Sequence, residues 1–327
     1  MSTISSSKPK TSYIPDDSIL PCISFLNTSD LGNLCQVQKE WQKLFDGPRG
    51  QILWKEASIR EGVPIVQGEN RIHKDDFKFL RPITVNKKTF ERYLGELVGD
   101  VPLMRADLFA RLKKSKDPFE PKKFQKNNYI VLIDPAALKI TVSPNRPLAM
   151  DATGTLVEVP VAERANIPPH ELIVPFSFKN FKALVTYFPV GKVNRPVFRE
   201  HLLDDNLDFF NQCNAPSVQN SILIMRKKNV IRDDIQVTNC GWEITTLRER
   251  TVYNSIKILK TGKCLEKKGQ SILFVRSAER LNVVGTCNIP LIGHFIPKIG
   301  LSLGQTNGTY YSGIVPCIHA EVPKKSN

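Results

Sequence analysis

The spacing of apolar residues changes near Tyr129, and this change limits the fold more than any other feature of the chain. Between residues 30 and 45, apolar side chains recur every three or four positions, which predicts an α-helix. From Tyr129 onward, short apolar runs such as YIVLI and LKITV are bounded by Asp-Pro and Ser-Pro-Asn, which predicts β-strands. Helices followed by strands with a few further helices are typical of an α+β protein with a mixed sheet.

Two helices and one hairpin are predicted inside the strand-rich part. Ser177 and either Thr245 or Thr246 are suited to cap the first turns, and Gly262 is suited to end the second helix. The side chains expected to face inward are Phe178, Phe181 and Leu184 in the first helix and Val252, Ile256 and Leu259 in the second. Asn307-Gly308, between GLSLGQT and YYSGIV, predicts a hairpin with a type I′ turn.

The first sixty residues predict three short helices. The apolar stripe of the middle helix consists of Leu31, Leu34, Val37, Trp41 and Leu44. Asp30 is expected to cap this helix, and Gly47-Pro48 to end it. An earlier helix carries Ile19, Leu20, Ile23 and Leu26, and a later one runs from about Gln51 to Arg60, with Gly62 as its stop. Helices this short bury little area, so we expect them to need a partner domain or a partner protein.

These residues resemble the F-box. That family's pattern begins with Leu-Pro and an acidic residue and passes through an apolar helix to an Asp-Leu break. It then continues through Val-x-Lys-x-Trp to a closing Leu-Trp. The corresponding residues here are Ile14, Pro15, Asp17, Ile19, Ile23, Phe25, Leu26, Asp30, Leu31, Leu34, Val37, Lys39, Trp41, Leu53 and Trp54. The chain departs from the pattern at Ile14, Ser18 and Cys22, and Pro21 removes one hydrogen bond from the first helix.

The resemblance implies binding to the Skp-type adaptor protein of a cullin–RING ubiquitin ligase. The residues expected to contact the adaptor are Ile14, Pro15, Ile19, Leu20, Ile23, Leu26, Leu31 and Leu34. Several of these would be semi-exposed without a partner, as apolar patches at interfaces are. The residues expected to fill the core of the module are Val37, Trp41, Leu44, Leu53 and Trp54. The alternative is that the three helices form a cap packed permanently on the rest of the chain.

The chain is expected to have four parts. Residues 1–12 read as a disordered tail, 13–62 as the F-box, 63–128 as a helical connector with a charged linker, and 129–327 as the α+β domain. In the connector, the spacing of Phe90, Tyr93, Leu94, Leu97 and Val98 predicts one helix that Gly99 ends, and a second is expected at Ala106 to Lys113. After residue 62 the layout loosely resembles F-box proteins of bacteria that live inside eukaryotic cells. This likeness implies an effector that acts in the host cytosol.

The composition limits which classes of partner and which cellular compartment we expect. The formal charge of +14 comes from dispersed lysines, which favours a basic surface over a nucleic-acid interface. The seven cysteines are scattered without a Cys-x-x-Cys pair, which is typical of reduced thiols in the cytosol. No apolar run is long enough to cross a membrane, and the N-terminal residues lack the apolar centre of a signal peptide.

No sequence motif predicts catalysis, a cofactor or a metal site. The chain lacks the Gly-x-x-x-x-Gly-Lys-Ser/Thr spacing of a phosphate-binding loop and any His/Asp/Glu spacing typical of metal ligands. Cys287 lies near His294, and Cys317 near His319, but nearness in sequence is weak support for a thiol enzyme. We therefore expect a non-enzymatic adaptor that presents an unknown protein target. The alternative is an enzyme of unknown class whose active site lies in the C-terminal domain.

Overall fold

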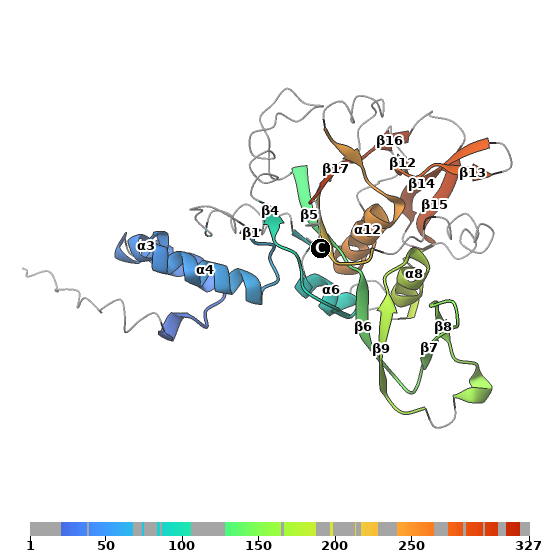
Figure 1. The fold of residues 1–327 in the computed structure, drawn as a ribbon, viewed down its shortest axis with the longest axis horizontal. Helices are drawn as coiled ribbons and strands as arrows, with labels where there is room; N and C mark the ends of the chain where they lie inside the picture. Colours follow the sequence, from blue (N-terminus) through green and yellow to red (C-terminus); the bar gives the residue numbers. More distant parts are fainter. Residues whose placement is uncertain are drawn as a thin grey trace, which may run out of the picture.

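The protein has an α+β fold, with the first helices on one side of the molecule and most strands on the other (Figure 1). The computed structural model describes residues 21–37, 39–67, 74, 84–85, 87–105, 128–164, 167–187, 197–198, 213, 217–227, 241–264, 274–283, 286–296, 298–306 and 312–320. The helices of these residues are α2 (Thr28–Val37), α3 (Lys39–Asp46), α4 (Pro48–Arg60), α6 (Lys87–Tyr93), the 3-10 helix η3 (Val161–Glu163), α8 (Phe178–Tyr187) and α12 (Leu247–Thr261). None of the helices in these ranges is long and apolar enough to cross a membrane.

In the part of the chain that the structure describes, the strands form two larger sheets and three small ones. The first sheet has the order β11 (Glu243–Ile244), β17 (Pro316–His319), β10 (Ser221–Arg226), β5 (Tyr129–Asp134) and β2 (Thr84–Val85). The second has the order β13 (Leu281–Val283), β14 (Thr286–Ile296), β12 (Phe274–Arg276) and β16 (Ser312–Ile314), and β15 (Gly300–Thr306) also pairs with β14. One small sheet has the order β3 (Glu96–Leu97), β6 (Ala137–Val142) and β9 (His170–Pro175). The other two are pairs of strands. One pair is β1 (Val66–Gln67) with β4 (Met104–Arg105), and the other is β7 (Leu148–Met150) with β8 (Leu156–Glu158). Both larger sheets are mixed, because β2 runs parallel to β5 and β12 parallel to β16.

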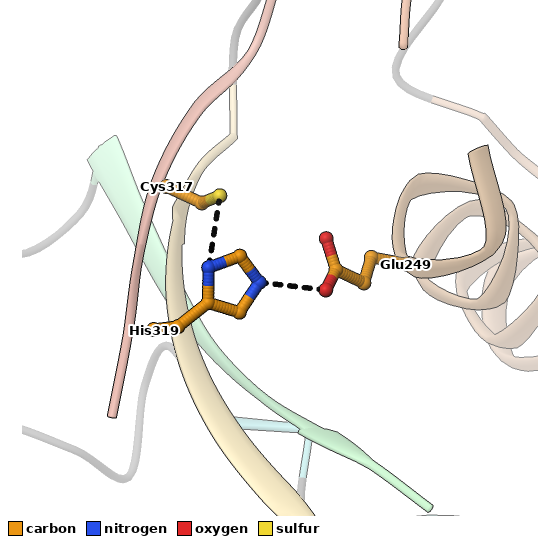
Figure 2. Close-up of side chains that lie close together, drawn as sticks. All are labelled: Glu249, Cys317 and His319. Carbon is orange, nitrogen blue, oxygen red and sulfur yellow. Dashed lines mark hydrogen bonds and ion pairs between the residues drawn. The ribbon is translucent and has the colours of Figure 1, made fainter. Parts of the chain in front are cut away.

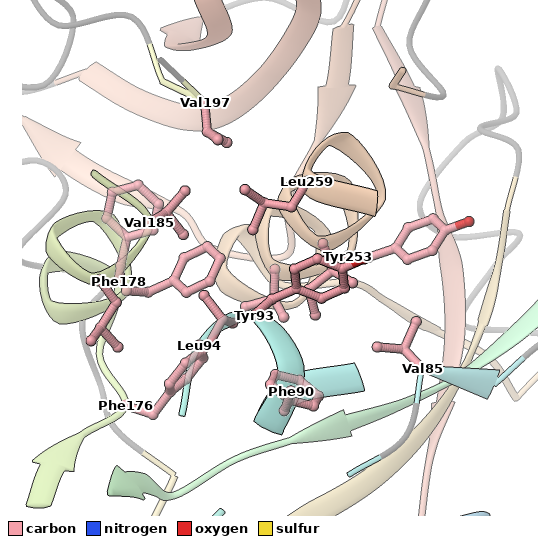
Figure 3. Close-up of a cluster of buried hydrophobic side chains, with 14 of the residues drawn as sticks. Val85, Phe90, Tyr93, Leu94, Phe176, Phe178, Val185, Val197, Tyr253 and Leu259 are labelled. Atoms are coloured by element: carbon pink, nitrogen blue, oxygen red, sulfur yellow. The ribbon is translucent and has the colours of Figure 1, made fainter. Parts of the chain in front are cut away.

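The central strands β5 and β10 of the first sheet are buried on both faces, which explains why both are continuous apolar runs. Along β5, Ile130 and Leu132 contribute to one buried cluster, and Tyr129 and Val131 contribute to another. The first cluster fills the space between this sheet and helices α6, α8 and α12 (Figure 3). The second cluster includes side chains of helices α2, α3 and α4 and of the opposite face of the sheet.

The described residues from 21 to 62, with the three helices α2, α3 and α4, form the N-terminal module. Asn27, rather than the expected Asp30, caps α2, because its Oδ1 accepts a hydrogen bond of 2.9 Å from the Asp30 N–H. Pro48 occupies the first turn of α4, which therefore begins earlier than the predicted Gln51. Gly62 follows α4 with a φ of 65°, as expected for a residue that ends a helix.

The connector departs from the single helix predicted around Phe90. Helix α6 ends at Tyr93, and Gly95 adopts a φ of 130°, which only glycine tolerates readily. Leu97 consequently belongs to β3 and pairs with Leu138. The apolar spacing correctly marked buried side chains except at Val98, which is half-buried, but the backbone changes from helix to strand within this spacing. The second connector helix, predicted at 106–113, lies outside the described residues.

Helices α8 and α12 confirm their predicted caps and inner faces. Ser177 Oγ accepts a hydrogen bond from the Asn180 N–H, and Thr246 and Glu249 form a reciprocal capping box at α12. The expected inner residues of both helices are buried. The predicted hairpin between β15 and β16 is wrong, because β15 pairs with β14 and β16 pairs with β12. The expected turn at Asn307-Gly308 lies outside the described residues.

Candidate functional site

The described part of the chain offers two candidate sites, the N-terminal module and a polar cluster at the start of α12. For the module, the structure divides the predicted adaptor contacts into three groups. Ile14, Pro15, Ile19 and Leu20 lie outside the described residues. Ile23 and Leu31 are buried, with 7% and 0% of their surface exposed, so they are not semi-exposed as expected. Leu26 and Leu34 are half-buried and pack against the same cluster.

The predicted core of the module is confirmed in part. Leu53 and Trp54 are buried, whereas Trp41 and Leu44 are half-buried, and Trp41 stacks on Phe45 with ring centroids 5.9 Å apart. Val37 is 67% exposed, so its assignment to the core is wrong. The physical reason is that the apolar stripe is divided between α2 and α3, and Val37 ends the first of them.

Polar contacts tie the two ends of the module together. The backbone N–H and the hydroxyl of Thr28 both donate to Glu61 Oε1, at 2.7 and 2.6 Å. Arg60 also donates to the Leu26 carbonyl at 2.8 Å. These bonds fix the start of α2 against the end of α4, so the module has a defined shape.

Several large apolar side chains of the module remain exposed. Phe25 is 87% exposed, and Ile52 and Ile59 of α4 are 56% and 57% exposed. Ile52 and Ile59 are seven residues apart and therefore lie on the same side of α4. These exposed side chains make the module a candidate interaction surface.

The polar cluster begins on two neighbouring strands. Cys317 and His319 are two residues apart on β17, so their side chains project from the same face of the sheet. Glu243 lies opposite Cys317 on the adjacent strand β11. Helix α12 covers this face and contributes Glu249 from its first turn (Figure 2).

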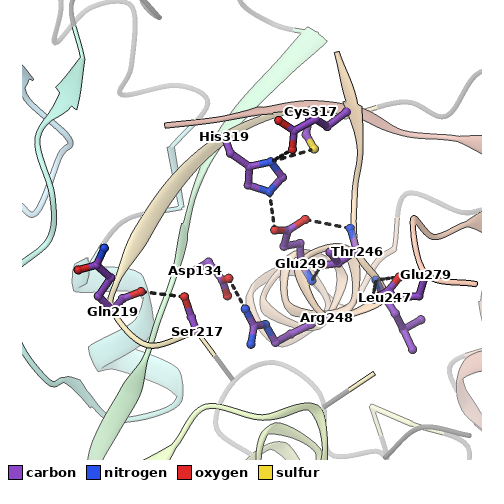
Figure 4. A network of polar contacts seen from close by, with 11 residues as sticks. Asp134, Ser217, Gln219, Thr246, Leu247, Arg248, Glu249, Glu279, Cys317 and His319 are labelled. Carbon is purple, nitrogen blue, oxygen red and sulfur yellow. Dashed lines mark hydrogen bonds and ion pairs between the residues drawn. The ribbon is translucent and has the colours of Figure 1, made fainter. Parts of the chain in front are cut away.

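His319 lies between two carboxylates. Its Nε2 donates to Glu249 Oε1 at 2.7 Å, and its Nδ1 contacts Glu243 Oε2. The Sγ of Cys317 lies 4.0 Å from the same Nδ1. The other oxygen of Glu249 accepts the Thr246 backbone N–H at 2.9 Å, so the capping box also orients this carboxylate (Figure 4). One ligand atom each from Glu249, Cys317 and His319 lies within 4.8 Å of the others.

Burial and charge set the protonation of the cluster. Burial raises the pKa of Cys317 to about 12, so its thiol is protonated at neutral pH. Burial alone lowers the pKa of His319. This effect is outweighed by the hydrogen bonds with Cys317 and Glu249 and by the charge of Glu249, so the pKa of His319 is raised. Burial likewise raises the pKa of Glu249, but His319 and Thr246 outweigh it and lower this pKa. The ground state is therefore a neutral thiol beside an imidazolium between carboxylates.

A second ion pair lies beside the cluster at the start of α12. Arg248 donates to Asp134 Oδ2 at the end of β5, and both side chains are at most 10% exposed. The Leu247 N–H donates to both oxygens of Glu279, at 3.0 and 3.1 Å. The free N–H groups of the first turn of α12 thus meet carboxylates, which the helix dipole favours.

The cluster does not suit a thiol nucleophile. Cys317 has no exposed surface, and a nucleophilic cysteine needs a lowered pKa and access to its substrate. The sequence indicated Cys317 and His319 only as neighbours and gave no sign of Glu243 or Glu249. A Cys-x-His pair on a strand does predict two side chains on one face, but their carboxylate partners come from elements more than sixty residues away.

Comparison of the chain with protein-family models, with curated proteins and with solved structures gives no match.

Proposed function

We propose that this protein is a non-enzymatic adaptor of a cullin–RING ubiquitin ligase. In this proposal the N-terminal module binds a Skp-type adaptor protein, and the α+β domain holds the protein target. The cytosol of a eukaryotic host cell would be its place of action, as expected for a bacterial effector.

The observation that carries the proposal is the exposure of large apolar side chains on a module with F-box-like spacing. Phe25 is 87% exposed and Val37 is 67% exposed, although both belong to that spacing. Exposed aromatic and aliphatic side chains next to a fixed helical scaffold are suited to fill pockets on a partner. Leu26 and Leu34 are half-buried, so each still presents part of its surface to a partner.

The burial of Leu31 changes how the proposal is tested. An aspartate in place of Leu31 would place a charge in the core of the module and disrupt its fold, because this side chain is 0% exposed. Loss of binding in such a variant would therefore say nothing about direct contact. Phe25 is the better position, because its side chain is exposed and a charge there leaves the module folded.

The experiment is a binding assay between the purified chain and a recombinant Skp-type adaptor. Phe25→Asp should weaken binding about tenfold or more, since a contact worth about 1.4 kcal/mol accounts for a factor of ten. Val218→Asp is the matched control, because Val218 is 96% exposed and lies outside the module. Equal affinity of both variants and the unchanged protein would contradict the proposed surface.

A further inference from the structure

The two edges of the His319 ring face different groups. Nδ1 faces Cys317 Sγ at 4.0 Å and the Glu243 carboxylate, whereas Nε2 faces Glu249. A single ion bound to both Cys317 and His319 must therefore lie on the Nδ1 edge. Glu249 remains on the opposite edge, where it accepts the Nε2 hydrogen. This arrangement matches metal sites in which an outer carboxylate fixes the ring of a metal-bound histidine.

We propose that Cys317, His319 and Glu243 bind a divalent transition-metal ion of the zinc type. Glu249 then orients His319 without binding the ion itself. The inference goes beyond the proposed adaptor function and does not depend on it.

The donor set selects the class of metal. A sulfur, an imidazole nitrogen and a carboxylate oxygen are all common zinc ligands. Magnesium and calcium prefer oxygen ligands alone, so the thiol of Cys317 disfavours them. Binding would replace the protons on Sγ and Nδ1 with the ion, and the proton on Nε2 would stay hydrogen-bonded to Glu249.

The separation of the sulfur and nitrogen ligands is already close to that around a bound ion. Zinc–sulfur and zinc–nitrogen bonds of ordinary length at a tetrahedral angle place the two ligand atoms about 3.6 Å apart. The present separation of Cys317 Sγ and His319 Nδ1 is 4.0 Å. Glu243 contacts the same nitrogen more closely than two ligands of one ion can lie, so its carboxylate would have to move back to admit the ion. Its side chain is 63% exposed, which leaves room for this movement and gives the ion a path from solvent.

A bound ion would join two strands at the edge of the first sheet. Glu243 belongs to the edge strand β11, and Cys317 and His319 belong to β17, so the ion would add a bridge beside their short backbone pairing. Three protein ligands also leave a fourth position for water or for a group from another molecule.

Cobalt(II) tests the proposal, because a cobalt–thiolate bond gives a charge-transfer absorption that other ligands do not. We expect one Co²⁺ per chain with this band after the full-length protein has been treated with a chelator and the chelator removed. Cys317→Ser should lose the band. Cys213→Ser should keep it, since Cys213 is buried elsewhere in the core. A missing band in the unchanged protein, or a band that persists in Cys317→Ser, would overturn the proposal.

Two carboxylate variants separate the roles of the ligands. Glu249→Gln should weaken Co²⁺ binding about 10- to 100-fold and keep the thiolate band, as expected for an outer partner of a ligand. Glu243→Ala should weaken binding without affecting the fold, because the side chain is exposed. If Cys317→Ser fails to fold by circular dichroism, Glu243→Ala decides, and an unchanged dissociation constant for Co²⁺ in that variant would overturn the site.

Discussion

The Sγ of Cys317 lies 4.0 Å from the Nδ1 of His319, on the same face of strand β17. The contact follows from the two-residue period of a strand. The carboxylates around the ring come from the adjacent strand and from the first turn of α12, so the cluster depends on the tertiary fold.

The first prediction concerns pH. In the metal-free protein, His319 is surrounded by Glu243 of β11, Glu249 of α12, Cys317 of β17 and the charge of Asp134 of β5. Its pKa is raised in the folded state, so the folded protein holds a proton that the unfolded chain releases above pH 6.5. The contribution of this proton to the free energy of unfolding is complete below pH 6.5. It is lost as the pH rises above that value, by about 1.4 kcal/mol per pH unit.

Urea unfolding between pH 6 and pH 8.5, with a chelator present, measures this slope. His319→Gln should remove the pH slope that this group contributes. His170→Gln should retain that slope, because the Nδ1 of His170 donates to the carbonyl of Pro168 at 3.1 Å, two residues away. The same slope in the His319→Gln variant would show that another group is responsible.

The second prediction concerns the close approach of α3 and α4. A methyl group added at Gly50 would lie 2.3 Å from the Cα of Phe45, so the two helices would have to move apart. We expect Gly50→Ala to destabilise the module by about 1–3 kcal/mol. Gly32→Ala is the matched control, because its nearest neighbour is a Trp54 ring atom at 4.0 Å, and alanine should stabilise α2 by about 1 kcal/mol. Thermal unfolding should give a lower melting temperature for Gly50→Ala and a higher one for Gly32→Ala. Shifts of the same sign in both variants would refute the close packing of α3 and α4.

The third prediction compares the two tryptophans of the module. Trp54 is 1% exposed, so Trp54→Ala should lower the free energy of unfolding by about 3–5 kcal/mol. Trp41 is half-buried, and Trp41→Ala should cost clearly less, although its position in the apolar stripe suggested a core residue. Equilibrium unfolding of both variants tests the order, and a larger loss for Trp41→Ala would contradict the structure.

The fourth prediction concerns thiol reactivity. Cys22 is exposed, whereas Cys213 and Cys317 are buried and burial raises the pKa of each to about 12. Iodoacetamide should therefore modify Cys22 in the folded protein long before it modifies either buried thiol. Mass spectrometry of the digested protein, sampled over time, gives the order in which the cysteines are modified. Rapid modification of Cys317 would instead support an enzyme with a thiol nucleophile.

The local signals of the sequence predicted most elements of the C-terminal part. Ser177 and Thr246 cap their helices, and Gly262 ends α12, because these effects depend on residues a few positions apart. The apolar run at 129–133 correctly indicated a strand, and every residue of that strand is buried.

The errors arose where tertiary pairing decided the outcome. Apolar residues at a helical spacing did not predict that Gly95 would turn the chain into β3, where Leu97 pairs with Leu138. The parallel pairing of β16 with β12 depends on residues almost forty positions apart, which a local turn signal cannot indicate. The boundary expected at residue 128 remains a prediction, although β2 and β3 of the connector pair with strands beyond it.

The most direct test of the adaptor proposal is hydrogen exchange of the full-length chain with and without a purified Skp-type adaptor. We predict saturable binding, with exchange slowed in the helices α2, α3 and α4 and unchanged in the strands of the α+β domain. Absence of binding at high adaptor concentration, or protection confined to the α+β domain, would contradict the account and leave the three helices as a structural cap.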